Sequence, residues 1–191
     1  APIATGGSVY PVLIGIPGYV GNAFCDGWGF SPVAETAYTM YEEGDIRRDG
    51  GILNFSQHAE ATGASYTARW QDTGYFLLKY IGRKNGNHGY TADPNLNYGN
   101  NQRVYRYAET LLNAAELIVR GAGSGDAQTY LNAVRTRAQV PMVSATLDNI
   151  IEERHLELMG EGKRYWDLVR SGKAESVLTA DKHLYRTVNW T

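Results

Sequence analysis

The side chains with the most obvious chemical potential are charged residues in the C-terminal part of the chain. Arg154, Glu157, Glu161 and Arg164 follow one another at intervals of three, four and three positions, which places them near one face of a helix. Two carboxylates on one face can act as a general acid and a general base, as in glycoside hydrolysis. The same spacing is typical of ion pairs between packed helices, where arginine binds carboxylates in a bidentate way. We favour the second interpretation and expect these charges to be structural.

Motifs for other kinds of catalysis are missing from the sequence. It contains no H-E-x-x-H, no phosphate-binding loop, no G-x-G-x-x-G and no G-x-S-x-G. Cys25 is the single cysteine and has no identifiable histidine partner, so it is not expected to be a nucleophile. The sequence therefore predicts neither a metal nor a cofactor, and it does not favour an enzyme.

Aromatic side chains offer a different chemistry, that of ligand binding. Trp28 lies between Gly27 and Gly29, so its indole has little local cover and is either inserted into a core or presented at a surface. A presented indole can stack on the C–H face of a sugar while nearby amides bind its hydroxyls. The chain has fourteen Tyr and four Trp but only four Phe. This excess of aromatic side chains with a polar group is typical of surfaces that are partly exposed to water. The candidate ligand contacts are Tyr19, Asn22, Trp28, Trp70 and Tyr75.

Composition and charge limit the kinds of partner. A formal net charge of −2 argues against nucleic acid, which requires a basic face, and there is no polybasic segment for an anionic membrane. No apolar run approaches the roughly 20 residues that span a bilayer. The 191 residues suit one or two small domains. The chain does not begin with Met, and we expect it to be processed or to be part of a longer protein.

The elements that must position these residues divide the chain into two predicted domains. Residues 1–103 are rich in Gly and loops. Residues 9–16 can form a short extended segment, but Pro11 argues against a central strand. A helix is expected from Ser31, as N-cap, with Pro32 at its first position, to about residue 43. Residues 75–81 form either a strand or a helical turn, because periodicity cannot decide so short a run. The long polar stretch at 82–103 is of the kind that is either functional or a linker.

Residues 104–191 are predicted to be helical. Apolar positions recur at three- and four-residue steps from Val104 to Val119, and two further helices follow N-cap candidates at Ser124 or Asp126 and at Thr146. A short fourth helix contains Tyr165–Val169. The sequence thus predicts a mainly α fold with two helical hairpins about forty residues apart. Since stacked repeats usually need at least three units, the first half or another chain must supply the remaining cover.

Three sequence blocks follow one another in the predicted helical half: RYAETLLNAAE at 106–116, LNAVRTRA at 131–138 and IIEERHLELMGEGKRYWDLVRSG at 150–172. These blocks and their order resemble the C-terminal portion of the SusD/RagB family of outer-membrane nutrient-binding lipoproteins of Bacteroidetes. The resemblance is dense from residue 104 onward and patchy before it. The family motifs assign structural ion-pair roles to Arg106, Glu116, Arg135, Arg154, Glu157, Glu161 and Arg164.

The resemblance implies a SusD-like fold of tetratricopeptide-like hairpins with a loop-rich ligand face. It implies a non-catalytic protein at the cell surface that captures oligosaccharide and delivers it to a TonB-dependent transporter of the SusC type. A lipid anchor is expected on the missing N-terminal portion, which we also expect to complete the domain. Two alternatives stay open: a RagB-like protein that captures peptides, and a helical-repeat scaffold that only docks a partner protein.

Overall fold

The computed structural model describes residues 7–85, 93 and 95–178, which form two compact units. Within these described ranges, the first unit contains residues 7–40 and 49–102, and the second contains residues 41–48 and 103–178. The segment Tyr41–Arg48 thus belongs to the second unit, although both of its chain neighbours belong to the first.

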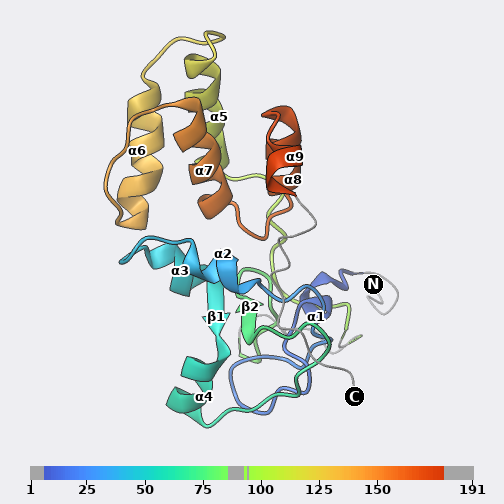
Figure 1. The fold of residues 1–191 in the computed structure, drawn as a ribbon. Coiled ribbons are helices and arrows are strands. Elements are labelled where there is room, and N and C mark those ends of the chain that lie inside the picture. The colour runs from blue at the N-terminus through green and yellow to red at the C-terminus, as the bar shows by residue number, and fades with distance from the viewer. Residues whose placement is uncertain (1–6, 86–92, 94, 179–191) are drawn as a thin grey trace. The chain divides into compact units, whose positions relative to one another are not determined.

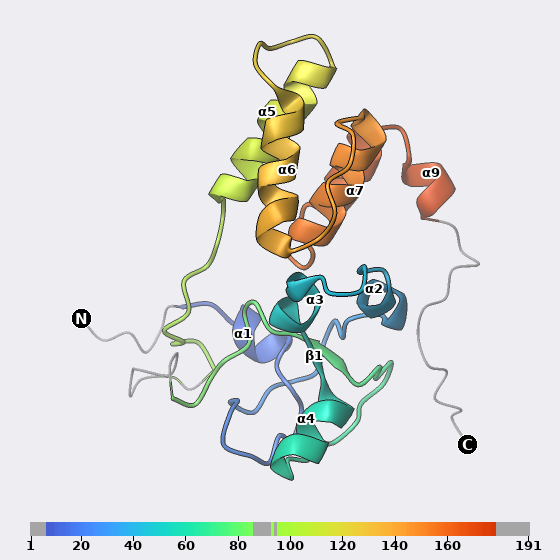
Figure 2. The same ribbon diagram turned by 90° about the vertical axis from the view of Figure 1, so that its left-hand side faces the viewer.

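The second unit is helical. Its helices are α5 (Tyr107–Val119), α6 (Ala127–Ala138), α7 (Leu147–Glu157), α8 (Arg164–Arg170) and α9 (Ala174–Val177). Helices α5, α6 and α7 lie side by side (Figures 1 and 2) and contact one another. The prediction of a mainly α fold is confirmed. None of the helices in the described ranges combines the length and the apolarity needed to cross a membrane.

Capping and apolar periodicity explain these helices. The Asp126 carboxylate accepts a hydrogen bond from the Gln128 N–H at 3.0 Å, and Thr146 caps α7 in the same way through Asn149. Leucines and alanines at three- and four-residue steps then form a core of Leu112, Ala115, Ala127, Leu131, Val134 and Ile150. The predicted apolar stripe is wrong at its first member, because α5 begins only at Tyr107 and leaves Val104 78% exposed.

The first unit consists mostly of loops with short elements. They are α1 (Tyr10–Leu13), α2 (Glu35–Thr39), β1 (Ile52–Asn54), α4 (Phe55–Thr62) and β2 (Tyr75–Leu77), and α3 (Ile46–Gly51) crosses the boundary between the units. Strands β1 and β2 are antiparallel and pair Leu53 with Phe76. The ambiguous run at 75–81 therefore begins as a strand. The sequence analysis predicts no element at residues 55–62, which form α4 with Asn54 as its N-cap.

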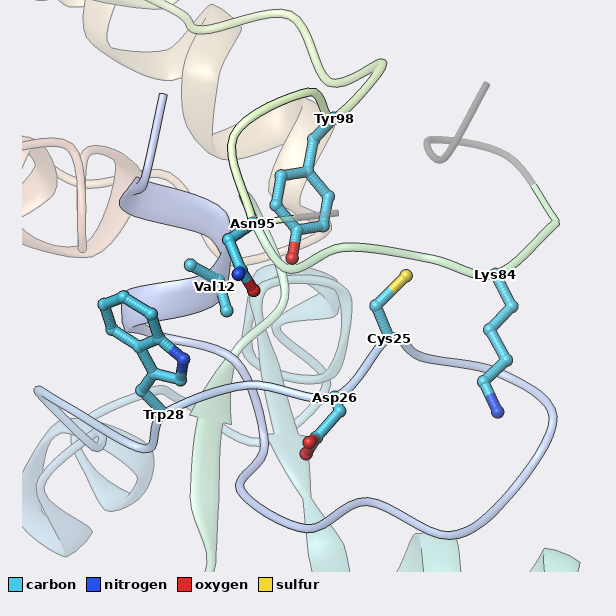
Figure 3. A pocket seen from close by; sticks show the side chains of 7 residues that line it. All are labelled: Val12, Cys25, Asp26, Trp28, Lys84, Asn95 and Tyr98. Atoms are coloured by element: carbon cyan, nitrogen blue, oxygen red, sulfur yellow. The ribbon is translucent and has the colours of Figure 1, made fainter. Parts of the chain in front are cut away.

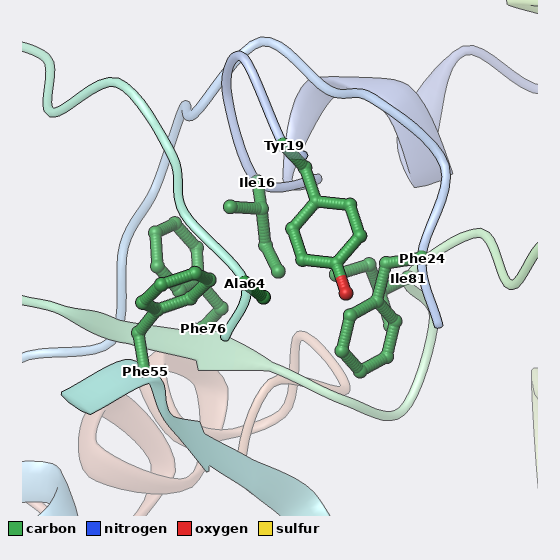
Figure 4. Close-up of a cluster of buried hydrophobic side chains, with 7 residues drawn as sticks. All are labelled: Ile16, Tyr19, Phe24, Phe55, Ala64, Phe76 and Ile81. Atoms are coloured by element: carbon green, nitrogen blue, oxygen red, sulfur yellow. The ribbon is translucent and has the colours of Figure 1, made fainter. Parts of the chain in front are cut away.

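Aromatic rings build the core of the first unit (Figure 4). It contains Ile16, Tyr19, Phe24, Phe55, Ala64, Phe76 and Ile81. The Tyr19 ring makes edge contacts with Phe24 and Phe55, at centroid distances of 5.6 and 6.3 Å. Because this core is drawn from loops as well as from β2 and α4, it fixes the course of the loops that follow Ile16.

Two predicted elements in this unit are wrong. Residues 9–16 are not extended, because α1 forms there with Pro11 in its first turn, where a missing N–H costs nothing. The helix expected from Ser31 to residue 43 shrinks to α2. Ser31 has a φ of 53°, and the Val33 N–H donates to the Tyr75 carbonyl at 3.0 Å, so tertiary pairing keeps this stretch out of the helix.

Candidate ligand-binding cavity

A surface cavity of about 350 Å³ lies in the first unit (Figure 3). It combines residues from α1, from the loop at 25–28, and from segments on either side of residues 86–92. Its lining side chains are Val12, Cys25, Asp26, Trp28, Lys84, Asn95 and Tyr98. Trp28 is 38% exposed and presents its indole at the cavity. An aromatic wall with a few polar groups is the usual composition of a small-molecule site.

Backbone pairing places Trp28 at the cavity. The Trp28 N–H donates to the Val12 carbonyl at 2.7 Å, and the Gly27 N–H donates to the Ile16 carbonyl at 2.9 Å. The two backbone segments approach so closely that a Cβ on Gly27 would lie 2.2 Å from the carbonyl carbon of Gly15. Glycine is therefore required at position 27 by the close approach of two backbones.

Gly27→Ala is expected to lower the free energy of unfolding by about 1–3 kcal/mol, because the added methyl must displace backbone. Chemical denaturation measures this loss. Gly50→Ala is the matched control, since a Cβ there meets nothing within 4 Å. It should leave stability unchanged or slightly raised. Equal stabilities for the two variants would contradict the close approach that positions Trp28.

Hydrogen bonds orient the carboxylate in the cavity, and burial keeps its hydroxyl and its thiol protonated. The Asp26 carboxylate accepts from the N–H groups of Gly27 and Tyr19 at 2.9 and 3.2 Å. Burial, followed by the nearby Cys25, Asp26 and Asp93, raises the pKa of the Tyr98 hydroxyl to about 12. Burial likewise raises the pKa of the Cys25 thiol, although Lys84 opposes this. The tyrosine hydroxyl therefore stays neutral, and the thiol is not activated as a nucleophile.

The lining residues differ from those of a glycoside hydrolase site. Asp26 is the only carboxylate among the described residues that line the cavity, whereas glycoside hydrolysis uses two carboxylates roughly 5–10 Å apart. Over the described ranges of the chain, no group of three His, Cys, Asp or Glu side chains is arranged to hold a metal ion. An indole, a phenol, an amide and a fixed carboxylate can together stack on a ring and bind hydroxyl groups.

The five residues that the sequence predicts as ligand contacts lie in different environments in the structure. Of these, Trp28 lines the cavity. Tyr19 is 7% exposed in the core and its hydroxyl lies 3.1 Å from His58 Nε2, which argues against a ligand contact. Asn22 is exposed on the preceding loop, and Trp70 is 61% exposed on a separate turn. Tyr75 is half-buried on β2, with its ring stacked on Tyr38 at 4.4 Å.

The other lining residues are not among the ligand contacts that the sequence predicts. One signal did point to them, since Asn95 and Tyr98 both fall in the long polar stretch at 82–103. Asn95 does form part of a turn, because its N–H donates to the Asp93 carboxylate at 2.8 Å. Its side chain nevertheless lines the cavity, which only the spatial meeting of this turn with α1 reveals.

The charged residues of the helical unit form ion pairs with one another. Arg106 binds Glu157 and also Glu161, the latter with two nitrogens at 2.8 Å. Glu157 in addition accepts from Arg137 at 2.5 Å and lies 3.2 Å from an Arg47 nitrogen. Arginines from outside α7 thus converge on carboxylates at the C-terminal end of this helix and just beyond it.

Glu153 lies at the centre of a second group of ion pairs. One of its oxygens pairs with Arg47 and the other with Arg135, at 2.6 Å in the latter case. Arg135 also binds Glu42 at 2.6 Å, and Arg47 binds Asp45 at the same distance. These contacts attach the segment Tyr41–Arg48 to α6 and α7. The hydroxyl of Tyr41, which donates to the Leu156 carbonyl at 3.0 Å, adds a further link.

A third group of charges joins α5, α7 and α8. Arg154 binds Asp167 at 2.9 Å, and Asp167 also binds Arg170 at 2.7 Å. Glu116 accepts from Arg170 and Arg120; burial alone would raise its pKa, but these hydrogen bonds hold the pKa below its usual value. These residues also line a depression of about 510 Å³, where they face one another as pairs. Arg164 makes a longer contact, 3.6 Å, with Glu152.

These observations define a class of protein in which a helical-hairpin unit held by buried ion pairs accompanies a loop-built unit with an aromatic cavity. The chain belongs to the SusD family, whose model matches residues 33–189. Two SusD-like proteins of Formosa agariphila are similar to it. One is 28% identical over 183 residues, covering 83% of this chain and 34% of the relative. The other is 36% identical over 89 residues, covering 39% and 18%.

Solved structures give a closer likeness. Surface glycan-binding protein A from Bacteroides thetaiotaomicron is 48% identical and matches all of this chain and 42% of its own length, with a TM-score of 0.87. The same protein in complex with laminarihexaose matches with 49% identity and a TM-score of 0.87, over 43% of its length. A laminarin binding SusD-like protein is 40% identical with a TM-score of 0.78, covering 92% of this chain and 40% of its own. The chain therefore spans less than half the length of these relatives.

Proposed function

We propose that this chain is part of a cell-surface glycan-binding protein and that the cavity around Trp28 contacts the oligosaccharide. The observation that carries the proposal is the half-exposed indole of Trp28, which forms one wall of a cavity together with Tyr98 and Asn95. The laminarihexaose complex of a protein 49% identical to this chain supports a glycan as the ligand.

The preferred ligand is a laminarin-type oligosaccharide. Two of the similar structures are described by laminarin or laminarihexaose binding. Two of the lining groups suit an uncharged sugar: the Tyr98 hydroxyl stays neutral and can both donate and accept, and the Asn95 amide offers a donor and an acceptor. Trp28 supplies the flat surface on which a pyranose ring can stack.

Isothermal titration calorimetry with the 191-residue chain tests this proposal. We expect laminarihexaose to bind, because stacking on the indole and hydrogen bonds to fixed polar groups favour it. A peptide pool should give no heat of binding. Binding of peptides and not of any glycan would support the RagB-like alternative. If neither glycans nor peptides bind, the result would support the alternative of a helical-repeat scaffold that only docks a partner protein.

We further propose that the protein binds without cleaving its ligand, since the cavity offers a single carboxylate among its described lining residues. The whole protein then acts at the outer membrane, carries a lipid anchor on its N-terminal portion, and delivers glycan to a transporter of the SusC type. That N-terminal portion also completes the helical stack. Membership of the SusD family supports these assignments.

A further inference from the structure

A second cavity, of about 370 Å³, lies in the same unit. Tyrosines and amides dominate its described lining, among them Tyr10, Tyr80, Tyr98, Asn101 and Gln102, and none of the described lining residues carries a charge. The first cavity, in contrast, includes Asp26 and Lys84. A site of amides and phenols without charge suits a neutral ligand rich in hydroxyl groups.

The two cavities adjoin one another. Tyr98 lines both cavities. Sequence neighbours also divide between them, because Val12 and Asn95 line the first cavity whereas Pro11 and Leu96 line the second. The dividing wall is therefore α1 together with the turn that begins at Asn95. A ligand that passes the Tyr98 side chain can contact both cavities.

Hydrogen bonds hold this wall in place. The Ser8 N–H donates to the Leu96 carbonyl at 3.0 Å, and a Cβ on Gly7 would lie 2.2 Å from the same carbonyl oxygen. Within the turn, the Asn97 side chain accepts from the Asp93 N–H at 3.0 Å. The Tyr10 and Tyr80 rings contact edge to face at 5.4 Å. A site whose walls are fixed before binding loses less entropy on ligand capture.

The Asn100 side chain ties the segment after the turn to the chain at Tyr80 and Ile81. Its amide nitrogen donates to the carbonyls of Tyr80 and Ile81, at 2.9 and 3.2 Å, which fixes the orientation of the amide. Its Oδ1 is buried and accepts no hydrogen bond within the described part of the chain. Because this oxygen is closed to solvent, the fixed Asn100 amide supports the cavity wall and is not itself a contact for the ligand.

We propose that the second cavity is a subsite for a neutral sugar unit, so that one oligosaccharide occupies both cavities across Tyr98. This inference rests on the proposed function. Each cavity lies near the lower end of the roughly 300–1,000 Å³ typical of small-molecule sites. A hexasaccharide is too large for either cavity alone, whereas a disaccharide can be held by the cavity of Trp28.

The test compares laminaribiose with laminarihexaose by calorimetry on the 191-residue chain and on the double variant Asn101→Ala/Gln102→Ala. Both residues are exposed, so the variant should keep its melting temperature. We expect the wild type to bind the hexasaccharide more tightly than the disaccharide. The double variant should lose about tenfold in affinity for the hexasaccharide, as for one or two hydrogen bonds, and nothing for the disaccharide. Gln57→Ala, an exposed amide outside both cavities, should bind like the wild type.

Three results would overturn the second subsite. The wild type could bind both sugars equally tightly, the double variant could bind the hexasaccharide unchanged, or it could weaken both sugars by the same factor. In each of these cases the proposed function survives, provided that glycan binding still depends on Trp28. If the wild type binds no glycan, the proposed function is wrong, and so is the proposal of a second subsite.

Discussion

Replacing Glu153 by alanine is expected to lower the free energy of unfolding by about 3–5 kcal/mol, the range found when one partner of a buried ion pair is removed. Glu153 is 1% exposed and binds Arg47 through one oxygen and Arg135 through the other. Its removal leaves two guanidinium groups without their central carboxylate. Arg47 keeps Asp45 and Arg135 keeps Glu42, but both largely buried guanidinium groups lose the carboxylate that they share, and this makes the loss large.

Urea denaturation followed by circular dichroism measures this effect, and Glu152→Ala provides the control. Glu152 is the adjacent residue on α7, but it is exposed and its pairs with His155 and Arg164 have separations of 3.2 and 3.6 Å. Its replacement should cost no more than about 1 kcal/mol, as for surface ion pairs. If both variants lose equally little, the buried charges do not hold the helical unit together.

Trp28→Ala is expected to weaken laminarihexaose binding by about thirtyfold or more, corresponding to the 2 kcal/mol or more that defines a binding hot spot. The indole forms a wall of the first cavity and is 38% exposed, so its loss removes ligand contact area. The melting temperature should change little compared with that of a variant that loses a fully buried tryptophan. Calorimetry and thermal unfolding on the same sample measure the two effects.

Trp70→Ala is the control that tests whether binding depends on the cavity or on any exposed tryptophan. Trp70 lies in the same unit and is more exposed, at 61%, but it is not among the residues that line the cavity. It should bind laminarihexaose as the wild type does. Loss of binding in Trp70→Ala with normal binding in Trp28→Ala would move the ligand site away from the cavity. A large fall in melting temperature for Trp28→Ala would instead indicate a tryptophan that supports the core.

The helices of the second unit were largely predictable because the signals that specify them lie within a few neighbouring residues. Apolar steps of three and four residues predict α5, α6 and α7, and the side chains of Asp126 and Thr146 cap the two later helices. The tendency of the charged motif to form ion pairs was also readable from residue types. The partners were not, since Arg47 reaches Glu153 across 106 positions in the chain.

The first unit was predicted less well because long-range contacts override its local signals. Val33 pairs with Tyr75, so the helix that Ser31 and Pro32 indicated does not form there. Tyr19 and Trp28 carried similar expectations as ligand contacts, yet one is packed against Phe24 and the other reaches a cavity. Nothing in the neighbouring residues distinguishes the two outcomes.

The amino-acid sequence by itself determined the helical hairpins, the structural use of paired charges and the family, because helix periodicity, capping and ordered motifs act over a few neighbouring residues. Only the tertiary structure decided which aromatic side chain is presented and which residues accompany it. The physical reason is that the cavity is assembled from Val12, Trp28 and Tyr98, which the chain brings together only through backbone pairing and core packing between distant loops.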